Sequence, residues 1–191
     1  MSYFDPAYQL MIQNEGGYQN HPNDPGNYNS QNILVGTNWG ISALTYELYY
    51  GTVPSEQDMM TLTKAQAAQI YRSDFWDPYN IAGINEQAIA NQLFDIRVHH
   101  SNWMWIINRA LVQVGLPVDL NDSWSNYGTV SKINSLVDPF AFNNALVDQR
   151  INYFVHLIQQ DPALAVFQNG WMARADRYTI GNGKNGGGIW P

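Results

Sequence analysis

Three polar residues near the start of the chain have the types and spacing that glycoside hydrolysis requires. Glu15 precedes two glycines, Asp24 lies in an Asp-Pro-Gly turn, and Thr37 comes shortly before another glycine. Hydrolysis of a glycosidic bond needs one carboxyl group that protonates the leaving oxygen and one ionised carboxylate that activates water or stabilises the positive sugar centre. Glu15, Asp24 and Thr37 are therefore the candidate catalytic residues.

The segment before Glu15 indicates how the acid would be positioned. Residues 5–14 have a helical pattern, with Asp5 predicted as the N-cap, Pro6 at the first helical position and the two glycines ending the helix. This places Glu15 in the last turn. There the free carbonyl groups disfavour a negative charge by roughly 0.3–1 kcal/mol, which favours the protonated acid. Asp24 lies in a turn open to water, which favours an ionised carboxylate.

Each of these residues also has a purely structural interpretation. Glu15 would be an ordinary residue at a helix end, Asp24 a turn former before proline, and Thr37 a cap. Asp-Pro-Gly is common turn chemistry, so any one of the three residues alone favours the structural interpretation. Only their combination favours catalysis.

The order of the motifs resembles the beginning of glycoside hydrolase family 108, the phage and bacterial N-acetylmuramidases. The resemblance is carried by Glu-Gly-Gly-Tyr at 15–18, Asp-Pro-Gly at 24–26, Thr-x-x-Gly-Ile at 37–41 and the Tyr-Arg and Trp-Asp-Pro run at 70–78. Farther on, residues 93–98 and 167–174 resemble the predicted peptidoglycan-binding region that ends such proteins. The resemblance implies a general acid at Glu15, a base at Asp24 and a water-holding hydroxyl at Thr37.

Two segments depart from the pattern of that family. Residues 27–36 form an Asn/Tyr/Ser-rich insert before Thr37, with a short Ile-Leu-Val run that predicts a β-hairpin over the cleft. The usual Asn-Ser-Gly after Val98 is replaced by His99, His100 and Ser101. What that second segment does in relatives is therefore not carried over to this chain.

The fold class predicted is mainly α, a lysozyme-like two-lobed helical fold with a small β-hairpin or sheet near residues 18–40. A catalytic lobe is expected over residues 1–84, and a helical C-terminal lobe that resembles a peptidoglycan-binding region over residues 85–191, packed as one compact unit. Helix starts are predicted from local capping patterns and from Asp-Pro pairs. The residues that carry these patterns are Ser42, Ser55, Thr63, Asp138 and Asp161.

A long, mostly buried helix is predicted from Asn85, and it carries Asp95 near its apolar face. A buried carboxylate needs partners, so pairing with an arginine or with backbone groups is favoured over catalysis for Asp95. The glycine-rich tail over residues 181–188 is predicted to be flexible.

Composition excludes several classes of function. The net charge of −7, with nine lysines and arginines, argues against nucleic-acid binding. No run is long and apolar enough to span a membrane, and the N-terminus has no secretory signal. There are no cysteines, and the adjacent pair His99 and His100 points in two directions on a helix. We therefore expect no metal and no cofactor.

The function expected is a peptidoglycan hydrolase that cleaves the β-1,4 bond between N-acetylmuramic acid and N-acetylglucosamine with inversion. Tyr18 and Trp39 are the candidate substrate-binding residues, because aromatic faces stack on sugar rings, although most buried aromatics fill cores. The alternatives are a lytic transglycosylase and a non-catalytic cell-wall-binding or phage-particle structural protein. The expected partner is peptidoglycan, the expected state is a monomer, and the cell wall is reached by phage release, in a virion or as a delivered effector.

Overall fold

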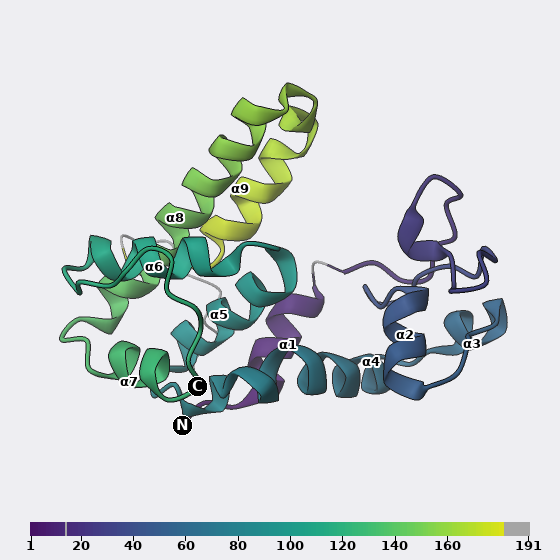
Figure 1. Ribbon diagram of the computed structural model, residues 1–191, viewed down its shortest axis with the longest axis horizontal. Coiled ribbons are helices and arrows are strands. Elements are labelled where there is room, and N and C mark those ends of the chain that lie inside the picture. The colour runs from purple at the N-terminus through teal and green to yellow at the C-terminus, as the bar shows by residue number, and fades with distance from the viewer. Residues whose placement is uncertain (14, 182–191) are drawn as a thin grey trace. The chain divides into compact units, whose positions relative to one another are not determined.

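The computed structural model describes residues 1–13 and 15–181 (Figure 1). The chain divides into two compact units. The small unit is Tyr8–Asp74, and the large unit combines Met1–Ala7 with the chain from Phe75 onward. Both consist mainly of helices, which confirms the predicted fold class. Among the described residues, no helix is long and apolar enough to cross a membrane.

Helix α1 spans Phe4–Ile12, which corrects the predicted boundaries at both ends. It begins before Asp5, so Asp5 lies in the first turn instead of at the N-cap. Pro6 is tolerated there because the first N–H groups of a helix have no intrahelical partner. The helix ends at Ile12, so Glu15 lies beyond the helix and not in its last turn.

Three further helices complete the small unit: α2 (Ala43–Tyr50), α3 (Glu56–Thr61) and α4 (Lys64–Tyr71). The predicted caps are confirmed. Ser42 accepts the backbone N–H of Thr45, and Ser55 and Thr63 both form complete capping boxes. The core of this unit contains Val35, Ala43 and Met59, with Tyr18 and Tyr46 packed against it.

The segment between α1 and α2 pairs with itself through isolated β-bridges. Antiparallel bridges join Gln19 to Thr37, Tyr28 to Leu34 and Asn38 to Ile41. The described part of this segment forms no regular strand, so the predicted hairpin or sheet is reduced to these three bridges. In the described segment, Asn29 shapes the tip, because its side-chain oxygen accepts the N–H groups of Gln31 and Ile33.

The large unit contains the remaining helices. These are α5 (Gln87–His99), α6 (Trp103–Gln113), α7 (Gly128–Asn134), α8 (Pro139–Gln160) and α9 (Gln168–Asp176), with η3 (Asp77–Tyr79), η4 (Ile81–Gly83) and η5 (Pro162–Phe167) as 3-10 turns. The π-helical turn η2 (Arg72–Trp76) follows α4 in the chain. Helices α8 and α9 lie side by side, joined by η5 (Figure 1).

Most helix starts in the large unit agree with the local signals. Asp138 and Asp161 cap α8 and η5, as predicted. Helix α7 has no counterpart among the predicted helices, because it is short and polar and lacks the apolar periodicity that marks longer helices. The predicted flexible tail at 181–188 lies outside the described residues, except for Gly181.

The prediction that Asp95 pairs with an arginine or with backbone groups is confirmed, and its partners are arginines. Every residue from Ile89 to Ile96 on α5 is buried, Asp95 completely. Its Oδ2 accepts a hydrogen bond from Arg150 at 2.5 Å, and its Oδ1 accepts one from Arg174 at 2.8 Å. These arginines come from α8 and α9, so the buried carboxylate joins three helices of the large unit. The two arginines outweigh the effect of burial and lower the pKa of Asp95 to about 2.

Candidate active site

Glu15 lies just beyond α1 and is half-buried. Its backbone N–H donates to the carbonyl of Ile12 at 3.2 Å, which turns the chain away from the helix axis. Its carboxylate lies against Gly40, where an added Cβ would come within 2.8 Å of Glu15 Oε2 and closer still to the hydroxyl of Tyr71. The φ of 74° at Gly40 also favours glycine. The candidate acid and the Thr-x-x-Gly-Ile motif are therefore in direct contact.

The turn before Gly40 is held in a conformation that ordinary residues rarely adopt. Trp39 has a φ of 51°, which is uncommon for a bulky residue and is often found at functional sites. Its indole N–H donates to the carbonyl of Leu62 at 2.9 Å, and its own carbonyl accepts from Tyr71 Oη at 3.2 Å. The ammonium group of Lys64 lies 4.6 Å from the centre of its ring. Trp39 is thus fixed and partly exposed beside the residue that contacts Glu15.

Asp24 is half-buried and caps the 3-10 turn η1 (Pro25–Asn27). Its Oδ1 accepts the backbone N–H of Gly26 at 2.9 Å. Its Oδ2 accepts a hydrogen bond from the side chain of Gln19 at 2.8 Å. One donor on each oxygen fixes the orientation of the carboxylate.

Thr37 lies beside the same turn as Asp24. Its hydroxyl donates to the carbonyl of Gly26 at 3.3 Å. A Cβ on Gly26 would lie 3.2 Å from Asp24 Oδ1 and 3.8 Å from Thr37 Oγ1, so both oxygens border this glycine. The structure therefore brings Asp24 and Thr37 together. Soon after Thr37 the chain reaches Gly40, which contacts Glu15.

Gln19 connects these parts, and sequence reasoning missed it. Its backbone pairs with Thr37 through hydrogen bonds of 2.9 and 2.8 Å, while its side chain holds Asp24. The same amide group exchanges two hydrogen bonds with the buried side chain of Asn27, at 3.0 and 2.9 Å. No local pattern marks Gln19, because its role depends on pairing with a residue far along the chain. Tyr71 was missed in the same way, although it lies in the Tyr-Arg motif at 70–78.

Tyr18 has a structural position. Its ring lies so close to Gly36, which has a φ of 90°, that a Cβ there would collide with it. Its hydroxyl lies 2.9 Å from Glu56 Oε1 and 3.2 Å from the carbonyl of Val35. Tyr18 therefore fastens the hairpin to α3.

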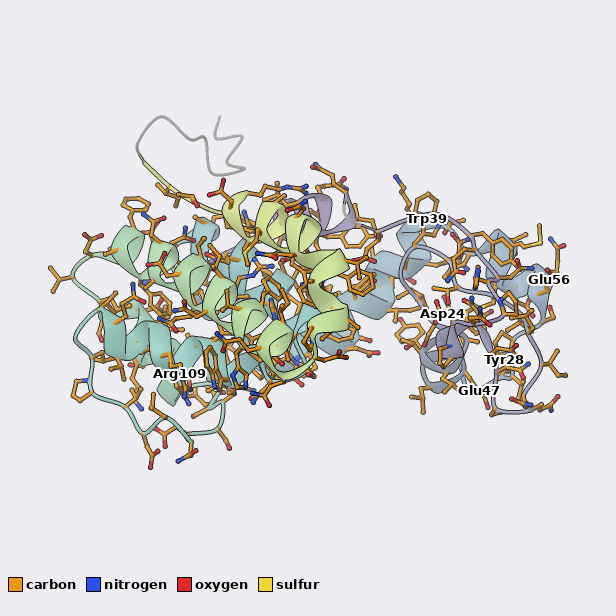
Figure 2. The ribbon with its side chains drawn as sticks, turned by 90° about the horizontal axis from the view of Figure 1, so that it is seen from above. Asp24, Tyr28, Trp39, Glu47, Glu56 and Arg109 are labelled. Atoms are coloured by element: carbon orange, nitrogen blue, oxygen red, sulfur yellow. The ribbon has the colours of Figure 1, made fainter. Side chains whose placement is uncertain are left out.

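The insert at 27–36 is also fastened to the helices of the small unit. The backbone and hydroxyl of Ser30 donate to the two carboxylate oxygens of Glu47 on α2, at 3.3 and 2.7 Å. The buried amide of Asn29 donates to the carbonyl of Pro54 at 3.0 Å. Figure 2 labels Asp24, Tyr28, Trp39, Glu47 and Glu56, all in this unit.

Of the two adjacent histidines, His100 lies in the apolar core of the large unit and His99 is partly buried. His100 is 2% exposed, and its ring lies 5.0 Å from that of Phe154. Burial, followed by the neighbouring arginines, lowers the pKa of His100 to about 2. Burial also lowers the pKa of His99 to about 4. Within the described residues there is no group of three or more His, Cys, Asp or Glu side chains that could hold a metal ion.

Comparisons with known proteins show similarity in fold and, over part of the chain, in sequence. The chain is similar in fold to the structure of Brucella abortus SagA, with a TM-score of 0.64 and 24% identity over 92% of this chain and 90% of that chain. A comparison with curated proteins gives no match. Residues 8–100 match the family described as Glycosyl hydrolase 108. The match begins at the first residue of the small unit and includes Glu15, Asp24 and Thr37, so the segment that holds the candidate site is similar to a family of glycosyl hydrolases.

Proposed function

We propose that this protein is a peptidoglycan hydrolase, an N-acetylmuramidase that cleaves the β-1,4 bond between N-acetylmuramic acid and N-acetylglucosamine. One observation carries the proposal. The segment that matches Glycosyl hydrolase 108 holds Glu15 against Gly40, and holds Asp24 and Thr37 around one turn. Two carboxylates on one compact unit supply the acid and the base that glycoside hydrolysis needs.

Glu15 is the general acid in this proposal. It donates its proton to the glycosidic oxygen as the bond from that oxygen to the anomeric carbon breaks. Gly40 and Tyr71 are positioning residues, because they border the carboxylate and limit where it can lie. A positioned acid contributes about 10² to 10⁴-fold to the rate.

Asp24 is the general base, and Thr37 holds the attacking water. Asp24 takes a proton from the water while the water oxygen bonds to the anomeric carbon from the opposite face. The product is then an α-anomer with inverted configuration. Inverting enzymes hold their carboxyl groups ~6.5–9.5 Å apart, which leaves room for the water. Gln19 is a positioning residue for Asp24, through its 2.8 Å hydrogen bond.

The substrate contacts proposed are those of Trp39 and Tyr18. Trp39 is partly exposed and comes directly before Gly40, which contacts Glu15. Its ring is held by the indole hydrogen bond and can lie against a sugar. Tyr18 acts mainly through the hairpin that it fastens. The large unit would bind peptidoglycan, and the protein would act as a monomer on the bacterial cell wall, after phage release, in a virion or as an effector.

The main competing function is a lytic transglycosylase. That reaction uses a hydroxyl of the substrate in place of water, so it needs the acid but no carboxylate that activates water. Asp24 accepts a hydrogen bond on each carboxylate oxygen, and a carboxylate held in this way favours hydrolysis. A non-catalytic wall-binding or particle protein would need none of these contacts.

Mass spectrometry of digested peptidoglycan separates the three functions. Hydrolysis adds one water per cut and leaves reducing N-acetylmuramic acid ends, which is the expected result. Anhydro ends would instead mean transglycosylation, and the absence of products would mean binding alone. Proton NMR of fresh products, read before mutarotation, should show the α-anomer. An initial β-anomer would mean retention and would exclude Asp24 as a base that activates water in an inverting step.

A further inference from the structure

The large unit contains a cavity of about 480 Å³ between the beginning of α6 and the loop that follows this helix. Its walls include three tryptophans, Trp103, Trp105 and Trp124, together with Arg109 and Asp122. This volume lies in the range of about 300–1,000 Å³ that is typical of small-molecule sites. None of these residues belongs to the unit that holds Glu15.

The three indole rings line this cavity and also contact other side chains: Arg97 and Tyr79 lie against Trp103, and His156 stacks on Trp105. All three are only partly buried. The rings of Trp103 and Trp124 lie 5.1 Å apart at an angle of 42°. The indole N–H of Trp124 is already directed to the carbonyl of Tyr79 and the side-chain oxygen of Asn126, both at 2.9 Å. What Trp124 has left to offer a ligand is therefore apolar ring surface.

Arg109 supplies the positive charge of the cavity. Its guanidinium group lies 4.0 Å from the centre of the Trp105 ring, which orients the plane of the group. Figure 2 labels this side chain on α6. In the described part of the chain, no hydrogen bond or ion pair engages Arg109, whereas Asp122 is paired with Lys132 at 3.6 Å. A planar, oriented guanidinium that no hydrogen bond or ion pair of the described residues engages is suited to a carboxylate ligand.

The opposite wall of the cavity is held in place. Asn108 is 2% exposed, and its amide donates to the carbonyls of Leu120 and Asp122 at 3.2 and 2.9 Å. These hydrogen bonds fasten the loop to α6. The cavity is thus largely formed before any ligand arrives, which lowers the entropic cost of binding.

We propose that this cavity binds a sugar that carries a carboxylate, with the tryptophan faces against the ring and Arg109 on the carboxylate. The choice of sugar rests on the proposed function: the ligand is an N-acetylmuramic acid residue of peptidoglycan, recognised through its lactyl carboxylate. The site belongs to the large unit and takes no part in bond cleavage.

The test compares two sugars that differ in this carboxylate. The full chain carrying Glu15→Gln is titrated with N-acetylmuramic acid and with N-acetylglucosamine to about 10 mM, which nearly saturates a site with a Kd of about 1 mM. Indole N–H signals are followed by NMR and assigned with Trp103→Phe and Trp105→Phe. N-acetylmuramic acid should shift the signals of Trp103 and Trp105, and N-acetylglucosamine should bind there at least tenfold more weakly.

Two variants isolate the charge. Adding Arg109→Gln should bring the affinity for N-acetylmuramic acid down to that for N-acetylglucosamine. Lys64→Gln removes the same charge from the small unit and should leave these shifts unchanged. Equal affinity of the two sugars, or no shift at either tryptophan, would overturn the inference. Wall lysis by the wild-type chain and by Glu15→Gln is measured separately. If lysis depends on Glu15 while neither sugar binds as expected, only this inference has failed and the proposed function stands.

Discussion

Glu15 lies against the backbone of Gly40, so closely that a Cβ on Gly40 would be 2.8 Å from Glu15 Oε2. The glycine of the Thr-x-x-Gly-Ile motif is therefore a neighbour of the candidate acid and not only a turn former. Its φ of 74° and the adjoining hydroxyl of Tyr71 both restrict what this position can accept.

Replacing this glycine should damage the site more than the fold. Gly40→Ala should lower the rate of wall lysis at least tenfold, because the new methyl group must displace Glu15 or Tyr71. Gly51→Ala is the matched control, since Gly51 has a similar φ of 69° and nothing within 4 Å of its Cβ position. Both variants should lose about 1–2 kcal/mol of stability from left-handed backbone strain. Equal activity in the two variants, measured by the clearing of wall suspensions, would argue against the contact.

A second prediction concerns the side chain that holds Asp24. Gln19→Glu replaces the N–H donor on Asp24 with a second carboxylate, which repels it. Hydrogen bonds to charged groups contribute about 1.5–3 kcal/mol, so we expect a loss of about 10 to 100-fold in kcat/KM. Gln31→Glu adds the same charge at an exposed position of the hairpin and should retain activity. If Gln19→Glu were as active as Gln31→Glu, Asp24 would not depend on this hydrogen bond.

Stability should fall in mild acid because of the buried histidines. Burial lowers the pKa of His99 to about 4 and that of His100 to about 2, beside Arg150 and Arg174. Below pH 6.5 the unfolded chain therefore binds protons that the folded chain does not. Each histidine that stays neutral costs about 1.4 kcal/mol per pH unit between pH 6.5 and 4. Asp95 affects stability at lower pH, because the stabilisation that it contributes is present above pH 3.8 and is lost as the pH falls toward 2.

Thermal unfolding at pH 7.5 and pH 5 tests this prediction. The Tm of the wild-type chain should fall between the two pH values, and that of His100→Phe should fall less, since phenylalanine binds no proton. His21→Phe changes an exposed histidine of the small unit and is the control. A fall in Tm that is the same in all three proteins would assign the acid sensitivity to other groups.

Much of the fold could be predicted because helix starts are local events. The caps at Ser42, Ser55 and Thr63 each depend on residues within three positions, and all three are present. The predicted end of α1 was wrong because no local signal fixes it to one residue. Two glycines permit several stopping points, but the helix stops before both of them, at Ile12, and Glu15 contacts Gly40 much farther along the chain.

Long-range pairing also explains what was missed in the site. Glu15, Asp24 and Thr37 could be selected because their chemistry and order are visible in the sequence. Gln19 could not, because it is an ordinary polar residue until the hairpin places it opposite Thr37. For Asp95 the need for an arginine or a backbone partner was predictable, but the two arginines lie on later helices that only the fold brings to it.

The central claim is that Glu15 is the general acid, and its amide variant tests this most directly. Glu15→Gln keeps the shape of the side chain but cannot donate the proton, so wall lysis should fall at least 100-fold with Tm and circular dichroism unchanged. Glu86→Gln makes the same change at the N-cap of α5, where the side chain forms no capping hydrogen bond, and should retain its activity. A Glu15→Gln protein that lyses walls at more than a tenth of the wild-type rate would contradict the assignment.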